Sequence, residues 1–232
     1  MKRLILVALL VAGLASPAMA GPIGETGMVS WQRVGGYYTG SGGEFTLFAY
    51  TGVLENDAYA ADSKNAGTPD PSFQTFCLEL DEFLEGNPMN YVVNSAVADG
   101  GKGGPTPDPL SFGTAWLYNQ FVSGTLQGYF TGVRTVEAGL LQNAIWMLEE
   151  EMDMDVTNPY IALAMGQFGG TYMDNAGVGY LNVYVLNNTY RQKNMQDFLW
   201  QDDIPTPDGG ATLMLLGGAL IGIGALRRKY RG

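Results

Sequence analysis

Apolar and polar side chains alternate over residues 28 to 34, which read Met-Val-Ser-Trp-Gln-Arg-Val. Successive side chains of a strand point to opposite faces, so this pattern predicts a half-buried β-strand. Residues 44 to 50, Glu-Phe-Thr-Leu-Phe-Ala-Tyr, are a second strand candidate. Two glycines at positions 35 and 36 are predicted to break the first strand, and residues 40 to 43 to form the turn before the second.

Helical periodicity begins after a connection at residues 100 to 109 that is rich in glycine and proline. Residues 111 to 122 repeat apolar side chains at mostly three- and four-residue spacing, which predicts a helix that stops before Gly124. The strongest helix pattern covers residues 135 to 151, with Thr135 as the expected N-cap. Its apolar stripe consists of Val136, Leu140, Leu141, Ala144, Ile145 and Leu148. The three glutamates at its end oppose the helix dipole, so we expect that end to be solvated.

Shorter stretches complete the expected layout. Residues 72 to 84 are expected to enter as a strand and leave as an acidic turn, whereas residues 62 to 71 and 87 to 91 are expected to be connections. Residues 180 to 186 are predicted to form a strand that returns to the opening sheet, and residues 196 to 200 a short element. The predicted fold class is α+β: a β-rich domain, with a sandwich or barrel-like sheet, and a helical insertion before the closing strand.

Both ends of the chain have patterns that are typical of membrane targeting. Residues 1 to 20 combine a basic start, an apolar stretch and a small-residue cleavage site, which predicts a cleaved signal peptide. Residues 211 to 226 are uncharged, and with flanking residues they are predicted to form a transmembrane helix. A basic cluster that would stay cytoplasmic follows directly: Arg227, Arg228, Lys229 and Arg231. One extracellular domain, residues 21 to 203, is expected between the signal peptide and a tail at residues 204 to 232.

Charge and composition exclude several classes of function. The chain has 12 basic and 23 acidic residues and a formal net charge of −11, and six of the basic residues lie at the two ends. An acidic domain repels nucleic acid, so no nucleic-acid partner is expected. With no histidine and one cysteine, no zinc site is expected, and no cofactor is implied. No nucleophile elbow, phosphate loop or metalloprotease motif is present, so we do not expect an enzyme.

Two acidic clusters lack the spacing of a calcium-binding loop. The first consists of Glu79, Asp81, Glu82 and Glu85, and the second of Asp153 and Asp155. We expect solvated acidic faces, with loose Ca²⁺ binding as the lesser alternative, so no metal ligands are assigned.

The tail has a specific order of elements: residues 204 to 210 (Ile-Pro-Thr-Pro-Asp-Gly-Gly), the apolar run, and the basic cluster. This order resembles the PEP-CTERM class of sorting signals, in a variant whose motif residues are Pro207, Asp208, Gly209 and Gly210. The resemblance implies processing by an exosortase in the inner membrane of a Gram-negative-type bacterium, with the tail in the membrane until it is removed. The product would reach the cell surface or extracellular matrix. An ordinary C-terminal anchor is the alternative.

Cys77 is the single cysteine of a chain that is predicted to be exported. Such a thiol is buried and inert, pairs with another molecule, or has reacted within its own chain. Gln142 is the candidate partner for the third case, on the motif given below. On a helical wheel it lies off the apolar stripe, and Trp146 lies one turn further on the same side. A tryptophan on an otherwise polar face indicates that this side also packs, with the strand of Cys77 as the candidate neighbour.

The stretches Phe76-Cys77-Leu78-Glu79 and Leu141-Gln142-Asn143-Ala144-Ile145-Trp146 resemble the two signature motifs of bacterial thioester domains. The resemblance implies that the Cys77 thiol and the Gln142 carboxamide condense into an intramolecular thioester, with Trp146 shielding the bond. An amine on a surface or matrix ligand would then attack it, which gives covalent adhesion. The layout of that family, β-rich with a helical portion between the motifs, agrees with the layout predicted above.

The same residues also allow an inert interpretation. Cys77 would then be a small buried hydrophobe, Gln142 a surface residue, and Trp146 part of a second packed face. The sequence therefore leaves two functions open for an exported surface protein. The first is a thioester-bearing adhesion module, and the second is a non-reactive structural protein of the extracellular polymer or biofilm matrix.

Overall fold

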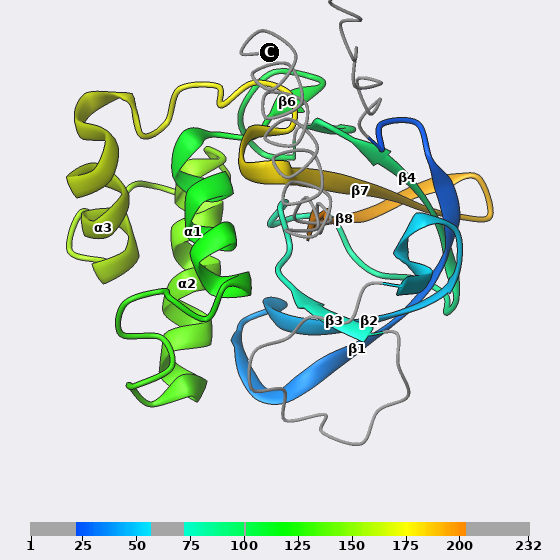
Figure 1. Cartoon of the computed structure of the whole chain (residues 1–232), viewed down its shortest axis with the longest axis horizontal. Helices are drawn as coiled ribbons and strands as arrows, with labels where there is room; N and C mark the ends of the chain where they lie inside the picture. Colours follow the sequence, from blue (N-terminus) through cyan, green and yellow to red (C-terminus); the bar gives the residue numbers. More distant parts are fainter. Residues whose placement is uncertain (1–21, 57–71, 100, 203–232) are drawn as a thin grey trace, which may run out of the picture.

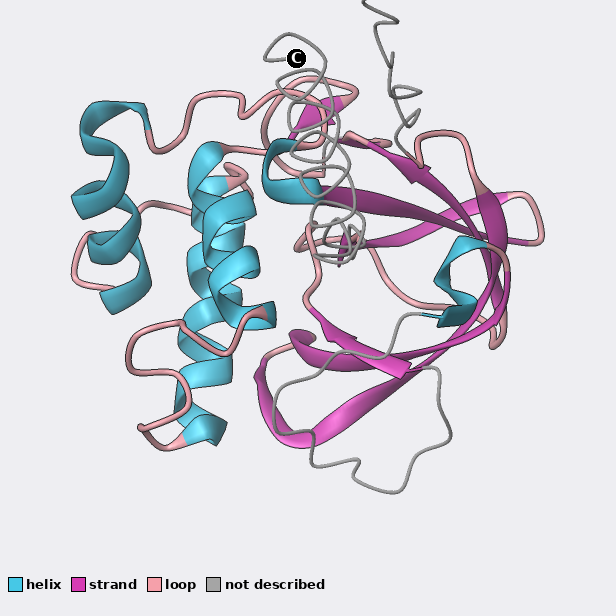
Figure 2. Cartoon of the chain, in the orientation of Figure 1, coloured by secondary structure: helices cyan, strands magenta, loops and turns pink. Residues whose placement is uncertain are grey.

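Six antiparallel strands form one curled sheet in the computed structural model, which describes residues 22–56, 72–99 and 101–202 (Figures 1 and 2). They are β1 (Thr26–Thr39), β2 (Gly42–Thr51), β3 (Ser72–Thr75), β4 (Met89–Asn94), β7 (Val183–Tyr190) and β8 (Lys193–Gln201). Their order across the sheet is β3-β2-β1-β4-β7-β8. A separate two-stranded ribbon consists of β5 (Ala96–Val97) and β6 (Asp108–Pro109).

The two outer strands of this sheet meet, so the sheet closes into a barrel. Cys77 lies two residues after the end of β3 and opposite Phe198 of β8 in an antiparallel bridge. Next to it, the Leu78 amide donates a hydrogen bond to the Asp197 carbonyl (3.1 Å). These contacts satisfy backbone groups that an open sheet edge would expose. The prediction of a β-rich domain is confirmed, and closure places Cys77 at the seam of the barrel.

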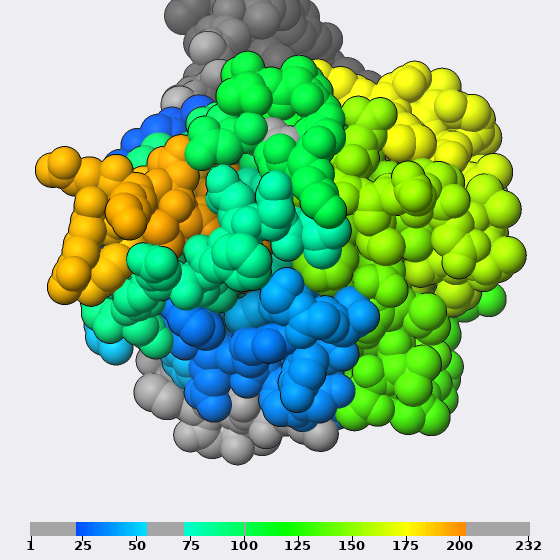
Figure 3. All heavy atoms as spheres, turned by 180° about the vertical axis from the view of Figure 1, so that it is seen from behind, coloured from blue at the N-terminus to red at the C-terminus, as the bar shows by residue number. Residues whose placement is uncertain are grey.

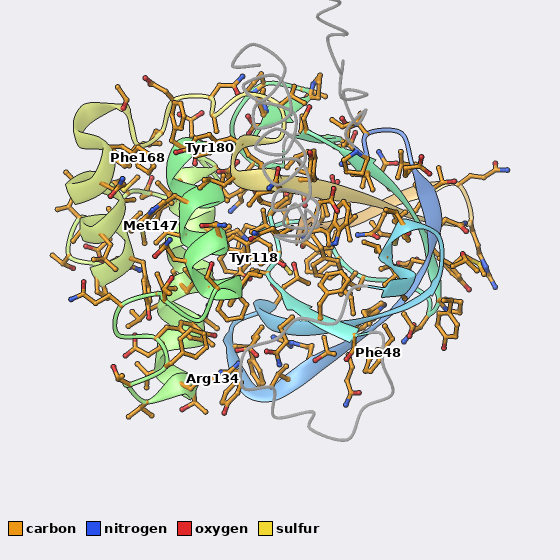
Figure 4. All side chains as sticks on the ribbon, in the orientation of Figure 1. Phe48, Tyr118, Arg134, Met147, Phe168 and Tyr180 are labelled. Atoms are coloured by element: carbon orange, nitrogen blue, oxygen red, sulfur yellow. The ribbon has the colours of Figure 1, made fainter. Side chains whose placement is uncertain are left out.

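The helical insertion lies between β6 and β7 and forms a layer on one side of the barrel (Figure 1). Its helices are α1 (Phe112–Val122), α2 (Arg134–Leu148) and α3 (Pro159–Phe168), and short 3-10 turns are η1 (Val53–Asn56), η2 (Gly169–Thr171) and η3 (Tyr180–Asn182). Helix α2 packs on β1 and β2, whereas α3 lies farthest from the sheet. Tyr118 of α1 reaches the barrel and donates to the Gln74 carbonyl (3.0 Å; Figure 4).

The helix predicted at residues 111 to 122 is confirmed as α1, with Ser111 as its N-cap. The predicted cap of α2 was wrong, because the helix begins at Arg134 and no side chain caps it. Helix α3 was not predicted, although Asn158 accepts a hydrogen bond from the Tyr160 amide (2.9 Å) and Pro159 occupies the first turn. Asparagine followed by proline is a recognised helix start, so this signal was present in the sequence.

The prediction of a solvated end for α2 was also wrong. The helix ends at Leu148, and both Glu149 and Glu151 are buried. The Glu151 carboxylate accepts hydrogen bonds from the backbone amides of Leu80 (2.8 Å) and Lys102 (2.7 Å). Charged side chains can be buried when they supply acceptors to loop amides that would otherwise lack partners.

Two strand predictions need correction. Strand β1 does not end at Gly35 and Gly36 but continues through them with a register shift between Arg33 and Tyr38. Residues 87 to 91 were expected to be a connection, yet β4 begins at Met89 and pairs with both β1 and β7. The closing strand predicted near residues 180 to 186 is confirmed as β7, in the same sheet as β1. The short element near residues 196 to 200 is confirmed as part of β8.

The predicted signal peptide (residues 1 to 20), loop (62 to 71) and tail (204 to 232) lie outside the described residues. Among the helices of the described residues, none is long and apolar enough to cross a membrane.

A buried ion pair connects the start of α2 to β2. The Arg134 guanidinium donates to the Glu44 carboxylate (2.9 Å), and the Tyr129 hydroxyl donates to the same carboxylate (2.7 Å; Arg134 is labelled in Figure 4). Arg134 also donates to Gln74 Oε1 (3.0 Å) in β3. These bonds compensate the desolvation of both charges and fix α2 against the barrel.

Replacement of Arg134 by methionine should lower the free energy of unfolding by about 3 kcal/mol, because Glu44 would stay buried without its cationic partner. Urea denaturation of the variant and the parent protein measures the difference. Lys193→Met, at an exposed position in the β7–β8 hairpin, is the matched control and should change stability by less than about 0.5 kcal/mol. Equal losses in both variants would contradict the structural role of the ion pair.

Candidate functional site

Cys77 lies at the barrel seam with its side chain directed into the barrel interior. Its neighbour Phe76 points the other way and packs edge-on against Phe121 of α1, with ring centroids 5.1 Å apart. This alternation is the ordinary two-residue period of an extended chain. The Cys77 side chain is only 3% exposed.

Gln142 reaches Cys77 from α2, and the structure brings the two predicted residues together. Its side chain is fully buried (0% exposed). Its Oε1 accepts hydrogen bonds from the backbone amides of Gly43 (2.9 Å) and Cys77 (3.1 Å), and its Nε2 donates to the Cys77 carbonyl (2.8 Å). The carboxamide is thus fixed in orientation against the backbone of the cysteine.

The Gly43 amide acts on both side chains. It donates a hydrogen bond to Gln142 Oε1 (2.9 Å), and it favours the ionised form of the Cys77 thiol. The Gln142 carboxamide is therefore held beside Cys77 through the backbone of the cysteine. Two backbone amides directed at one carbonyl oxygen form the kind of arrangement that stabilises a developing oxyanion.

Two glycines of β2 permit close contacts here, Gly43 with β1 and Gly42 with the side chains of α2. Gly43 has a φ of 143°, and a Cβ there would lie 2.4 Å from the Tyr37 carbonyl oxygen. A Cβ on Gly42 would lie 2.3 Å from Trp146 Cζ2 and 3.0 Å from Gln142 Cδ. Sequence reasoning assigned both glycines to a turn and missed their role. Their position directly before a strand was the available signal.

Trp146, one turn after Gln142 on α2, packs beside the site. It is 3% exposed and packs in the barrel interior together with Cys77. Its indole Nε1 is buried and has no hydrogen-bond partner among the described residues. The ring covers Gly42 closely and keeps bulk water away from the carboxamide.

Burial raises the pKa of the Cys77 thiol well above its usual value, and the nearby Glu79 carboxyl raises it further. The Arg33 guanidinium and the Gly43 amide act in the opposite direction. Cys77 is therefore a neutral thiol at physiological pH, which is a poor nucleophile toward external reagents.

The acidic segment after Cys77 is solvated only in part, because Asp81 and Glu85 are exposed, as predicted, whereas Glu82 is half-buried and Glu79 is buried. Glu79 is 1% exposed, and its Oε2 accepts hydrogen bonds from Gln196 Nε2 (2.6 Å) and the Asp197 amide (3.0 Å). Burial, and then the charge of Asp197, raise the pKa of Glu79 to about 10. Burial also raises the pKa of Asp197, although the amides of Ala98 and Asn188 oppose the shift. The charge of Asp197 thus favours the protonated form of Glu79.

Asp153 and Asp155 of the second cluster are exposed, as predicted. Within the described residues, no group of three or more acidic or cysteine side chains is placed to hold a metal ion.

The comparison with protein families concerns the tail. Residues 207–230 match the VPDSG-CTERM motif, a PEP-CTERM-like sorting signal. This match contains the predicted motif residues and the first three residues of the basic cluster, all outside the described residues. The chain is therefore an exported protein that an exosortase processes, with the cell envelope or surface as its destination. No curated protein and no solved structure matches the chain.

The raised pKa of Glu79 predicts how the stability of the folded protein depends on pH. Glu79 binds its proton more tightly in the folded protein (pKa about 10) than in the unfolded chain (4.5), so the folded state holds more protons between these values. Its stabilising contribution is complete below the unfolded value and is lost as the pH rises toward the folded value. The free energy of unfolding of the parent protein should therefore fall as the pH rises from about 5 to about 9. In Glu79→Gln this fall should be smaller by at least ~1 kcal/mol.

Urea denaturation across this pH range measures the effect. Glu85→Gln, an exposed carboxyl on the same segment, is the matched control and should follow the parent profile. Identical slopes for Glu79→Gln and the parent protein would show that Glu79 is ionised in the fold.

Proposed function

We propose that the domain forms an intramolecular thioester between Cys77 Sγ and Gln142 Cδ and uses it to attach covalently to amine-bearing partners on a surface or in the extracellular matrix. The observation that supports it most directly is the geometry of Gln142. Its carbonyl oxygen accepts from two backbone amides, and its nitrogen is held by the carbonyl of the cysteine itself.

The chemistry needs only groups that the site contains. The Cys77 sulfur adds to Gln142 Cδ, and the carbonyl oxygen takes up negative charge between the amides of Gly43 and Cys77. The thiol proton passes to Nε2, the C–N bond breaks, and ammonia leaves as the C–S bond remains. No general base takes part in this step. Instead, the fold holds the thiol and the carboxamide in a fixed arrangement, which gives them a high effective concentration.

The surroundings suit a bond that water would otherwise hydrolyse. Cys77, Gln142 and Trp146 are all almost completely buried, and the barrel wall covers them. Exclusion of water lengthens the lifetime of a reactive acyl group. The thioester is consumed once by its partner, so the chain acts as an adhesin and not as an enzyme.

Sorting would present this domain where such partners occur. The exosortase that processes the tail would reside in the inner membrane of a Gram-negative-type bacterium, and the tail would hold the chain in that membrane until cleavage. The domain would then be displayed at the cell surface or in the matrix, where proteins and amino sugars offer amines.

Intact-mass analysis tests the thioester. We expect the purified protein to be lighter by one ammonia than its sequence requires, as judged against Cys77→Ala, whose tail is processed identically. Methylamine should convert the parent protein to a species one methylene heavier than the unreacted sequence and release a thiol that can be labelled. Gln142→Ala should show no deficit.

If the parent protein has the full mass that its sequence requires, the thioester is excluded. That result would favour the alternative, a non-reactive structural protein of the extracellular polymer or biofilm matrix. A deficit that persists in Cys77→Ala would exclude the assignment of the sulfur.

Deletion of the exosortase tests the sorting route. The protein should then stay in the membrane fraction with its tail attached, whereas the parent strain should release a form that lacks the tail. Replacement of Asp208 and Gly209 by alanine should have the same effect, because both lie in the motif. Unchanged processing without the exosortase would indicate an ordinary C-terminal anchor.

A further inference from the structure

A small cavity lies over the barrel seam and has Cys77 in its wall. Its volume is about 200 Å³, and its other lining residues include Trp31, Arg33, Phe45, Glu82 and Phe83. Ligand pockets for whole small molecules usually measure about 300–1,000 Å³. The volume of this cavity therefore suits one narrow chemical group and not a whole small molecule. In the view from behind, the segment that follows β3 lies between the β1–β2 residues and the β7–β8 hairpin (Figure 3).

The cavity combines apolar walls with one carboxyl group and one guanidinium. Trp31 and Phe45 form an edge-on aromatic pair with centroids 6.2 Å apart, and Phe83 is 65% exposed. Such walls suit an alkyl chain, and aromatic faces also attract a cation. Glu82 offers a half-buried carboxyl in the same cavity as the Cys77 sulfur.

Arg33 is fixed in place, and part of its guanidinium is unused. It donates to the carbonyls of Gly40 (3.0 Å) and Gly42 (3.4 Å), and it lies over the Tyr38 ring at 4.1 Å. Its Nε is buried without a hydrogen-bond partner among the described residues. Its charge favours the ionised form of the Cys77 thiol.

We propose that this cavity admits a primary amine on an unbranched alkyl chain, such as a lysine side chain. In this proposal Glu82 takes the proton of the incoming ammonium, and Arg33 stabilises the thiolate that leaves. The inference rests on the thioester proposed above and assigns the chemistry of its opening.

The opening reaction balances with these groups. An alkylammonium enters and gives one proton to the Glu82 carboxylate, which frees the nitrogen lone pair. The nitrogen attacks the acyl carbon of Gln142, a C–N bond forms, and the C–S bond breaks with its electron pair on sulfur. A second proton passes from nitrogen to the thiolate. The products are an amide and the Cys77 thiol.

The surroundings of Glu82 agree with the role of a base near neutral pH. Burial, together with the charges of Asp197, Asp99 and Asp81, raises the pKa of Glu82 to about 7. A general base is most effective when its pKa lies close to the working pH. Arg33 is the cationic group on the wall of the same cavity.

Two amines that differ in basicity test the assignment. The probes are Nα-acetyl-lysine amide, whose ε-amine is protonated at neutral pH, and hydroxylamine, which is already neutral there. The rate of thioester loss is followed by intact mass in the parent protein, Glu82→Gln, Arg33→Gln and the exposed control Glu85→Gln. Each variant is first shown to carry the ammonia deficit.

Glu82→Gln should slow the reaction with the lysine analogue on the order of 10²-fold and leave that with hydroxylamine nearly unchanged. Arg33→Gln should slow both reactions on the order of tenfold or more, because both release the same thiolate. Glu85→Gln should react like the parent protein.

The measurements distinguish the role of Glu82 from the formation of the thioester itself. If Glu82→Gln carries the deficit yet reacts with the lysine analogue at the parent rate, or loses rate equally with both amines, Glu82 is not the base. If the parent protein shows no deficit at all, the thioester and the present inference both fall.

Discussion

The contact between the Gln142 carboxamide and the backbone of Cys77 joins the two layers of the molecule. One side chain of the helical layer spans the barrel seam, and all its polar atoms are satisfied by backbone groups of Gly43 and Cys77. A buried amide left without these partners would cost on the order of 1–3 kcal/mol. The closure of the barrel, the glycines of β2 and the placement of α2 must therefore be compatible with one another.

This constraint explains several features that a simple barrel would not need. The Arg134–Glu44 ion pair fixes the first turn of α2 on β2, and Gln142 lies two turns further along the same helix. The adjacent glycines let the helix approach, and Trp146 fills the space beside them. The same geometry can serve either an inert, well-packed junction or a reactive acyl site, and the difference between them is one covalent bond.

Acidic groups surround the site in an unusual way. Glu79 and Asp197 are buried together next to the cysteine, while Glu82 faces the cavity that leads to it. Burial raises the pKa of the first two, and it gives the third a pKa near neutrality. One short acidic segment thus contributes both to the stability of the barrel seam and to the chemistry proposed for the cavity.

The sequence alone determined the features that depend on neighbouring residues. The alternating and helical patterns predicted β1, β2, α1, α2 and β7, and the linear order of the tail motif predicted the sorting signal that the family comparison confirmed. The pairing of Cys77 with Gln142 could be suggested from motifs, but 65 residues separate them, so only the tertiary structure could decide their proximity. Folding also decided that Glu79, Glu149 and Glu151 are buried, because backbone amides from distant loops supply the hydrogen bonds that water would otherwise provide.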